Sequence, residues 1–479
     1  MCVSIASAGP PKPKLKITRL HRLSYCPDCL QKQQEIDRLR EENTRLKARL
    51  RYQERTAKEG FFGSATPSAQ VPVKANTASP RQPGAPGGAR LGHRGHGRSA
   101  LSPEKADQVI LVPGAAACPD CGGALRDGRC QARSVRDIQP LRAQTLCYQL
   151  QQKYCPRCRR TVRPRAPGVF ARTLLSNRLL AHAAVQHYLF GVTLGQLAVQ
   201  LGVGNGTLQG AFHQLAERLE PACQTLAAAY RQAPVKHADE THWRTDGSNG
   251  YAWLFCSEKI SVFRFRQTRS GQVAQEVLGL QPLAGVLVVD RYPGYNQAPC
   301  SLQYCYAHLL REVQDLAKEF PDEIEVQVFV SLFAPLLAAA MHLRGEKLPP
   351  EQFRARASDL KEQIVDWSEN VASHPGVQRI QNIFREHPGR LYHWAENAQV
   401  PADNNFAERE LRPLVIARKI SFGSQSEKGA RTRETLMSLL HTLRKRGGPT
   451  TQLFEQALSA LSQDHSLAPH DALFTIDSS

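Results

Sequence analysis

Apolar and polar residues along this chain change their spacing near Ala233. From Phe170 to Tyr230 the apolar residues recur at helical spacing. Within that stretch, TLGQLAVQLGVGNGTLQGAFHQL divides into two predicted helices at the turn Gly202–Gly206. A DNA-binding helix-turn-helix has this form, although any helical hairpin gives a similar pattern. The segment therefore predicts a helical domain, with DNA binding as its functional hypothesis.

After Ala233 the pattern becomes that of strands. HADETHWRT, GYAWLFCSE and ISVFRFRQT predict a meander of three strands, GQVAQEVLGL a helix, and AGVLVVD a buried strand. Residues 301–400 are helical in pattern throughout, including YCYAHLLREVQDLAKEF and FVSLFAPLLAAAMHL. NNFAERELRPLVIARK predicts a further helix, which Pro413 should end or kink. Three strands, a helix, a strand and further helices are the order of a ribonuclease-H-like core.

Near the N-terminus, IDRLREENTRLKARL carries a short heptad pattern. Ile36, Leu39, Leu46 and Leu50 fit the a and d positions, and Asn43 occupies an intervening a position, where asparagine fixes the register of two-stranded coiled coils. The pattern predicts self-association through a coiled coil. It is only two to three heptads long, so a single solvated helix is the alternative.

The charge of the chain points to a polyanionic partner. The 479 residues carry a formal net charge of +19, and residues 60–101 contain no acidic residue. Such an excess favours nucleic acid by counterion release, with solubility or a basic tail as the alternative. We expect no membrane span, because we find no apolar run that approaches the roughly 20 residues of a membrane helix. The N-terminal charge follows the first apolar patch, which is the wrong order for a signal peptide.

Six of the thirteen cysteines fall in C-x-x-C pairs, which indicates metal-bound thiolates in a reducing cytosol. Cys118 with Cys121 and Cys155 with Cys158 form two knuckles that can complete a tetrahedral structural Zn²⁺ site. The alternative is a set of unmetallated thiols. Cys26 and Cys29 form a further knuckle of open role. The second zinc knuckle is flanked by arginines that could contact phosphates, among them Arg157, Arg159 and Arg160.

Three carboxylates stand out by their settings. Asp239 lies in the first predicted strand, and Asp290 ends a buried one, the usual position for a site in an open α/β sheet. Glu240 should point to the face opposite Asp239. Glu408 lies on the downstream helix, where Glu410 and Asp403 compete with it for the third role. Three such acids can hold a pair of Mg²⁺ ions for displacement at a phosphodiester; the alternatives are turn-forming aspartates and a surface pair of Glu408 with Arg412.

The strings DET, VVDRYPGYN, YCYAHLLRE, DNNFAERELRP and RKISFGS, in this order, resemble transposases of the Insertion Sequence 66 family. The resemblance covers most of the chain. It implies a DDE triad on Asp239, Asp290 and Glu408, in a ribonuclease-H-like fold with a helical insertion between the last two acids. The element C-x-x-H, Cys305 and His308, is also similar to the family, and on a helix it would point back at the active site, for packing or for DNA contact. The Cys26–Cys29 knuckle departs from the family pattern.

With this resemblance we expect a bacterial cytoplasmic, nucleoid-associated transposase. It would bind terminal inverted repeats in double-stranded DNA, cleave at the transposon ends and join the 3′-OH ends to target DNA, using two Mg²⁺ (or Mn²⁺) ions. Asn404 would support the site, while Arg412, Arg418 and Lys419 hold phosphates. A homodimer would pair the ends, possibly with accessory proteins encoded by the same element. The rivals are a non-enzymatic zinc and helix-turn-helix regulator and a stand-alone structure-specific nuclease.

The predicted organisation is a multidomain α/β protein. Its segments are a basic tail (1–24), a C-x-x-C element with a short coiled coil (25–59), a flexible basic linker (60–100), a zinc-binding module (101–166), a helix-turn-helix-like domain (167–232), a ribonuclease-H-like catalytic domain (233–446) with a helical insertion at about 310–400, and a C-terminal helical tail (447–479).

Overall fold

The structure is a computed structural model that describes residues 31–32, 34–47, 104, 109, 117, 121–123, 143–162, 164–171 and 173–475. The predicted basic tail and basic linker, the Cys26–Cys29 knuckle, Leu50 and Cys118 lie outside the described residues. The chain divides into two compact units, one built from residues 1–65 and 305–402 and the other from residues 66–304 and 403–479. Each unit is described by itself.

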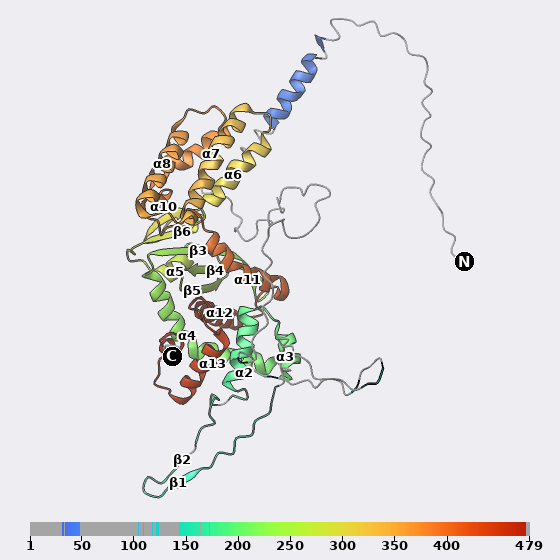
Figure 1. Cartoon of the computed structure of the whole chain (residues 1–479), viewed down its shortest axis with the longest axis vertical. Coiled ribbons are helices and arrows are strands. Elements are labelled where there is room, and N and C mark those ends of the chain that lie inside the picture. Colours follow the sequence, from blue (N-terminus) through green and yellow to red (C-terminus); the bar gives the residue numbers. More distant parts are fainter. Residues whose placement is uncertain are drawn as a thin grey trace, which may run out of the picture. The chain divides into compact units, whose positions relative to one another are not determined.

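The larger unit is organised around a five-stranded mixed sheet (Figure 1). Its strands are β3 (Val235–Thr245), β4 (Ser248–Cys256), β5 (Ser261–Arg266), β6 (Val286–Val289) and β7 (Ser301–Tyr304), in the order β5-β4-β3-β6-β7. The first three strands are antiparallel, and β6 and β7 run parallel to β3. Asp246 and Gly247 both have positive φ, which the two-residue turn between β3 and β4 requires. The prediction of a mixed α/β fold is confirmed.

Two sequence-based expectations about these elements were wrong. Residues 301–304 form strand β7 rather than the beginning of a helix, and α6 starts only at Tyr306. Leu302, Gln303 and Tyr304 are buried beside β6, so sheet pairing overrides the helical pattern of the following residues. Helix α11 (Asn405–Ser421) continues through Pro413 instead of ending there. Its packing on β3 offsets the hydrogen bond that proline cannot donate.

Helix α12 (Glu427–Lys445) closes the exposed edge of the sheet at β5. The main-chain N–H groups of Ser261, Phe263 and Phe265 donate to Thr442 Oγ1 at 3.0 Å, Ser438 Oγ at 2.9 Å and Glu434 Oε2 at 3.1 Å. The three acceptors are spaced by four residues and so share one helix face, while the three donors alternate along the strand. The helix therefore satisfies the free donors of an edge strand, which would otherwise invite another chain.

A helical segment precedes the sheet in the same unit. It comprises α2 (Asn177–Ala184), the π-helical turn η3 (Val185–Leu189), α3 (Leu194–Leu201) and α4 (Asn205–Arg231). The two helices predicted for a helix-turn-helix are α3 and α4, but α4 begins at Asn205, so Gly206 lies inside it. Gly202 ends α3 with a φ of 64°. α5 (Gln272–Leu278) contacts α4, and α13 (Thr450–Gln463) and α14 (Pro469–Phe474) follow α12.

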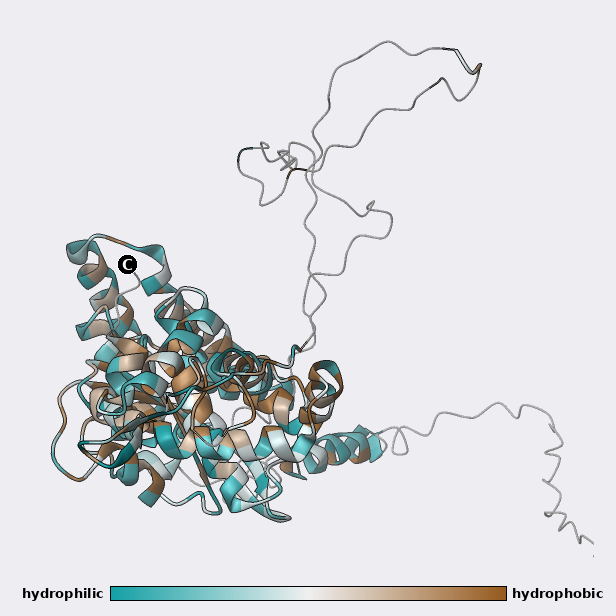
Figure 2. Ribbon diagram, turned by 90° about the horizontal axis from the view of Figure 1, so that it is seen from below, coloured by the Kyte–Doolittle hydropathy of each residue, from teal (hydrophilic) through white to brown (hydrophobic). Residues whose placement is uncertain are grey.

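The other unit is a helical bundle of α6 (Tyr306–Glu319), α7 (Ile324–Leu343), α8 (Pro350–Glu369), α9 (Pro375–Glu386) and α10 (His393–Glu396). Most of its helices are amphipathic, and Figure 2 shows both hydrophilic and hydrophobic sides on the ribbons. Residues 324–346 are long and apolar enough to cross a membrane, by length and composition only. The expectation that no such run exists was therefore wrong. Phe329, Phe333 and Leu337 of α7 are buried in the bundle, although only 28% of the apolar window of this helix is buried.

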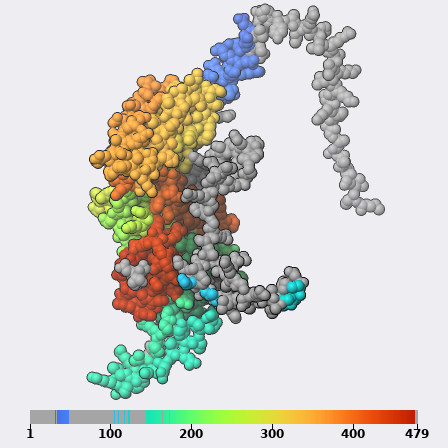
Figure 3. Space-filling view, in the orientation of Figure 1, coloured from blue at the N-terminus to red at the C-terminus, as the bar shows by residue number. Residues whose placement is uncertain are grey.

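Residues 34–47, in the predicted coiled coil, are helical. Ile36, Leu39 and Leu46 are 43%, 49% and 55% exposed in the single chain. Figure 3 shows this helix (blue) uncovered on its visible face. The apolar positions on which the heptad prediction rests are thus accessible to a partner helix.

Candidate active site

Strands β3 and β6 bring the first two predicted acids to the same level of the sheet. In their parallel register His237 lies beside Val288, so two residues further along each chain Asp239 is level with Asp290. Asp239 is 1% and Asp290 is 7% exposed. Asp239 Oδ1 accepts the main-chain N–H of Glu240 at 2.9 Å, and Asp290 Oδ1 accepts that of Tyr292 at 3.0 Å. The two carboxylates are therefore buried and oriented by backbone donors.

In the protein without a bound cation, the surroundings of Asp290 shift its carboxyl toward the protonated form. Burial is the main cause, and the negative charge of Glu240 adds to it, so the pKa of Asp290 rises to about 7. The Tyr292 N–H and the charges of Arg269 and Arg291 act in the opposite direction but do not compensate. A cation at this position would relieve the repulsion.

Glu240, the neighbour of Asp239, belongs to a separate buried network. Its Oε1 accepts from Arg269 Nη2 at 2.6 Å and Nε at 3.0 Å, and its Oε2 accepts from the hydroxyl of Tyr295. The Arg269 guanidinium lies 3.7 Å from the ring centre of Tyr292, whose N–H holds Asp290. This network connects Glu240 to the backbone support of Asp290. The sequence analysis assigned no role to Tyr292 and Tyr295, although both lie in the string VVDRYPGYN, and it did not single out Arg269. Arg269 lies in another loop, and a local pattern does not show which loops meet.

Helix α11 is fixed to β3 at two points, which define the side of the helix that faces the sheet. At its start, Asn404 donates to the Ala238 carbonyl at 2.8 Å, and its Oδ1 lies 2.9 Å from His237 Nδ1. Near its end, Arg418 Nη1 donates to Thr241 Oγ1 at 2.8 Å and to the His242 carbonyl at 2.7 Å. Arg418 therefore stabilises the packing of α11 on β3 through Nη1. The phosphate contact expected of Arg418 stays a prediction.

The third predicted acid lies on this sheet-facing side. Asn404, Glu408 and Arg418 are separated by four and ten residues, so they fall on one stripe of the helix. The stripe contacts His237 and Thr241, which lie two residues before and two residues after Asp239. These three side chains therefore lie on the same face of β3. Glu408 is half-buried between the two contact points. The fold therefore turns Glu408 toward the face of the sheet that carries Asp239.

The two competing acids have other partners. Glu410 Oε2 lies 3.3 Å from Lys445 Nζ and accepts from Ser261 Oγ at 3.3 Å, so its carboxylate joins α11 to α12 and β5. Asp403 Oδ1 accepts the N–H of Asn405 at 2.9 Å at the start of α11. Both acids stabilise the fold locally. Of the remaining predicted phosphate contacts, Arg412 and Lys419 are exposed on α11.

The donor chemistry of the site suits a hard divalent cation, since it consists of carboxylate oxygens in buried surroundings. In the described part of the chain, however, no three side chains from His, Cys, Asp and Glu are gathered at the distance of a metal site. Asp239 and Asp290 are level on adjacent strands, and Glu408 approaches from a helix. The carboxylates fit Mg²⁺ or Mn²⁺ because carboxylate oxygens are the ligands these ions prefer. They also lie toward the same face of the sheet.

The second cysteine knuckle is formed by the turn between β1 (Lys153–Cys155) and β2 (Arg160–Val162). The Cys158 N–H lies 3.5 Å from Cys155 Sγ, and Arg159 has a φ of 52°. Donors from Cys158 and Arg157 lower the pKa of Cys155, which favours its thiolate. Cys121 is exposed, and Cys118 lies outside the described residues. Arg157, Arg159 and Arg160 are exposed beside the knuckle.

The C-x-x-H element lies in the helical unit. Cys305 is fully buried and occupies the N-cap of α6, ahead of its first turn, and His308 is half-buried inside the helix. The expectation that both residues lie on a helix was therefore wrong for Cys305, because β7 and its end occupy residues 301–305.

Comparison with known proteins identifies the family of this chain. Residues 172–432, more than half of the chain, match the model of the Transposase IS66 family. Two uncharacterized proteins of Sinorhizobium fredii are similar to the chain. The protein y4jD is 24% identical over 71% of this chain and 73% of its own length, and y4qI is 26% identical over 63% and 62%. On the family match, this chain belongs to the IS66 transposase family.

Proposed function

We propose that this chain is a DDE transposase that cuts DNA at transposon ends and joins the freed 3′-OH ends to target DNA. The observation that carries the proposal is the common placement of three acids. Continuing the parallel register of β3 and β6 makes Asp239 on β3 level with Asp290, which directly follows β6. Glu408 lies on the stripe of α11 held against the same face of β3. The strand order β5-β4-β3-β6-β7, with β5, β4 and β3 antiparallel, supports a ribonuclease-H-like core.

In this proposal Asp239, Asp290 and Glu408 hold two Mg²⁺ (or Mn²⁺) ions. When bound, such a pair activates an attacking water or 3′-OH and stabilises the leaving oxygen of the phosphodiester. The residues of the chain orient this centre. The N–H groups of Glu240 and Tyr292 fix the two aspartates, and Asn404 fixes the start of the helix that carries Glu408. Burial excludes bulk water, which strengthens each electrostatic contact.

The other modules would recognise the DNA ends and assemble the protein into a dimer. We assign recognition of terminal inverted repeats to the α3–α4 hairpin and to a zinc module held by Cys118, Cys121, Cys155 and Cys158. Arg412 and Lys419 on α11, together with the arginines beside the zinc knuckle, would contact phosphates. The exposed apolar positions of helix 34–47 support pairing in a homodimer. Cytoplasmic location and the use of accessory proteins remain part of the same proposal.

The test is cleavage and joining of DNA that carries the sequences flanking the gene, in Mg²⁺ or Mn²⁺. We expect Asp239→Asn, Asp290→Asn and Glu408→Gln each to abolish both reactions, a loss of at least about 10³-fold, while DNA binding is retained. Glu410→Gln and Asp403→Asn are the matched controls, because they remove a carboxylate from the same helix region. Activity that survives in the three variants would refute the site.

The same assay separates the rival functions. A non-enzymatic regulator would bind DNA but give no cleaved product with the wild-type chain. A stand-alone nuclease would cleave but would not join a supplied 3′-OH end to a second DNA. Joining of pre-cut ends by the wild-type chain, and its loss in Glu408→Gln, would favour the transposase over both.

A further inference from the structure

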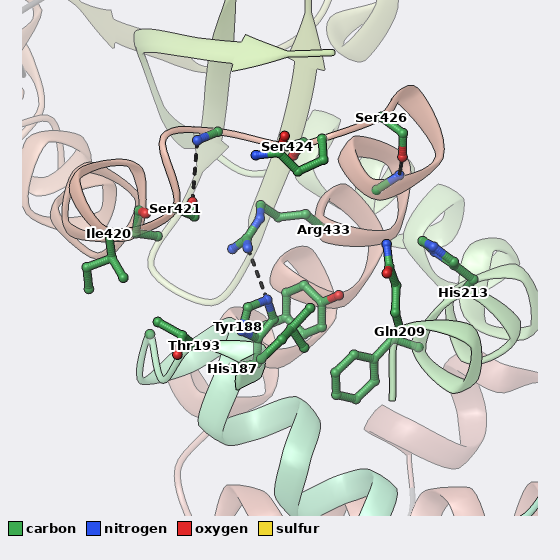
Figure 4. A pocket seen from close by; sticks show the side chains of 17 residues that line it. His187, Tyr188, Thr193, Gln209, His213, Ile420, Ser421, Ser424, Ser426 and Arg433 are labelled. Atoms are coloured by element: carbon green, nitrogen blue, oxygen red, sulfur yellow. Dashed lines mark hydrogen bonds between the residues drawn. The ribbon is translucent and has the colours of Figure 1, made fainter. Parts of the chain in front are cut away.

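A cavity of about 260 Å³ lies in the larger unit, between the η3–α3–α4 segment and the connection from α11 to α12 (Figure 4). Its lining includes His187, Thr193, His213, Ser424 and Arg433, and it contains no aspartate or glutamate. A cavity whose lining has cationic and hydroxyl groups but no acid is suited to an anion. It is separate from the candidate active site, none of whose three acids lines it.

Arg433 is the main charge in this cavity, and it is 7% exposed. It extends from α12 toward His187 and Tyr188, as Figure 4 shows. Its guanidinium lies 5.2 Å from the ring centre of Tyr188 and 5.3 Å from that of Trp243. Among the described residues, no carboxylate forms an ion pair with Arg433. A buried charge of this kind is costly unless an opposite charge accompanies it.

The neighbouring arginines show how the fold treats a buried cation elsewhere. Arg264 and Arg266 on β5 lie 3.2 Å and 2.8 Å from the carboxylate of Glu434. Glu434 is adjacent to Arg433 in sequence but points to the sheet. Because Glu434 already forms ion pairs with the two arginines of β5, it does not neutralise Arg433. The charge of Arg433 is therefore available to a ligand.

His187 orients Arg433 without neutralising it. The Nδ1 of His187 lies 2.7 Å from the Val192 carbonyl, so Nδ1 carries the proton and donates. Its Nε2 then accepts from Arg433 Nη2 at 3.1 Å. Burial, and next the charge of Arg433, lower the pKa of His187 to about 4, which keeps the imidazole neutral at physiological pH. The pair therefore retains one full positive charge.

Further donors surround this charge. Ser426, the N-cap of α12, and Gly429 in its first turn line the cavity, so the positive end of a 19-residue helix faces the same space. Ser424 Oγ accepts from Trp243 Nε1 at 3.1 Å, which leaves its own O–H to donate. Gly423 has a φ of 128°, and a Cβ there would lie 2.2 Å from the Arg244 carbonyl oxygen, so only glycine permits this loop path.

We propose that this cavity binds a phosphate group of a DNA strand, with Arg433 as its charged ligand and the start of α12 and Ser424 as neutral donors. The inference rests on the proposed action of the chain on DNA and assigns a second DNA contact, separate from the acids of the active site. Guanidinium groups match phosphate geometry by paired donors, which explains an arginine at this position better than a lysine. The site would fix the path of the strand rather than take part in chemistry.

The experiment measures affinity for a labelled DNA duplex of mixed sequence as a function of salt, using the full chain. Arg433→Met should weaken binding about tenfold, and the slope of log affinity against log salt should fall by about one, as for a lost phosphate contact. Ile420→Trp is a second variant, because Ile420 is exposed on α11 and lines the cavity, so a bulky ring fills the space and leaves Arg433 in place. It should give the same loss.

Two controls match these variants. Ile420→Ala shortens the side chain without filling the cavity, and Arg356→Met removes one exposed arginine from α8. Both variants should bind within about twofold of wild type. Thermal unfolding in inorganic phosphate and in chloride at equal ionic strength distinguishes free phosphate as the ligand. A phosphate-specific rise in the wild-type midpoint, with unchanged DNA affinity in both cavity variants, would overturn the DNA assignment.

The outcomes also separate this inference from the proposed function. Wild-type affinity and salt slope in folded Ile420→Trp protein would refute the phosphate site alone, even if Arg433→Met does not fold. Weaker DNA binding in both cavity variants would support the phosphate site. Cleavage of DNA that is already bound should still depend on Asp239. A wild-type chain that binds no DNA would instead overturn the proposed function and this inference together.

Discussion

Asn404 donates its side-chain amide to the main-chain carbonyl of Ala238 at 2.8 Å, immediately before Asp239. Its carbonyl oxygen also lies 2.9 Å from His237 Nδ1. A single 1%-exposed side chain thus joins the start of α11 to the strand that carries the first acid. This contact sets where the stripe bearing Glu408 meets the sheet.

Asn404→Ala should therefore misplace Glu408 while the rest of the sheet stays folded. We expect a destabilisation of roughly 1–3 kcal/mol, because buried partners lose their hydrogen bonds, and a loss of DNA cleavage that exceeds any loss of DNA binding. Asn405→Ala is the matched control one residue away. Urea unfolding and the cleavage assay measure the two effects. Full cleavage activity in Asn404→Ala would show that this contact does not position Glu408.

Glu240→Gln should destabilise the fold through Arg269. Glu240 is fully buried, and the side chain of Arg269 is 10% exposed, so the variant leaves a nearly buried cation without its acid. Breaking such a pair costs about 3–5 kcal/mol. The double variant Glu240→Gln/Arg269→Met should recover part of this loss, and a double-mutant cycle in urea measures the coupling. Additive effects of the two changes would contradict a coupled pair.

Removal of a knuckle thiolate should release zinc. Metal analysis of the purified chain should find about one Zn²⁺ per chain, and Cys155→Ser should lower this content sharply, because four-coordinate sites need all their ligands. Cys147→Ser is the control, since Cys147 is an exposed cysteine outside the two knuckles. Wild-type protein that carries no zinc after purification in zinc-containing medium would refute the predicted module.

Acid should destabilise the larger unit through its buried histidines. Burial, with Arg444 and Lys445 nearby, lowers the pKa of His441 to about 3, and that of His187 is lowered to about 4. Through these two histidines the unfolded chain binds more protons than the folded one below the ordinary histidine pKa of about 6.5, whereas Asp290, whose pKa is raised to about 7, acts in the opposite direction over the same range. Two histidines against one carboxyl leave a net fall in stability as the pH drops from about 6.5 toward 4. The expected loss is on the order of 2–4 kcal/mol.

His441→Phe tests the origin of this acid sensitivity. The residue is fully buried and its ring lies 5.1 Å from that of Phe263, so phenylalanine keeps an aromatic contact and removes the titration. Thermal midpoints at pH 6.5 and pH 4.5 should differ less in the variant than in the wild type. An unchanged difference would mean that other groups cause the acid sensitivity.

Much of the larger unit could be predicted from local pattern. The three antiparallel strands, α5 and β6 follow from alternating and continuous apolar runs, and Asp239 and Asp290 follow from their positions in such strands. Residues 301–304 were mispredicted because a four-residue strand has too few positions to show a period before a long helix. Pro413 was misleading because the packing of α11 on β3 outweighs one lost hydrogen bond.

The sequence by itself determined the type of most elements of the larger unit, the charge of the chain and the chemistry of its candidate acids, because these depend on residue type and local spacing. Only the tertiary structure decided that Asp239 and Asp290 are level, through the parallel register of β3 and β6. The tertiary structure also turned Glu408 toward the sheet and paired Glu410 with Lys445. The Arg433 cavity likewise depends on segments about 240 residues apart, and no local pattern records how such segments meet.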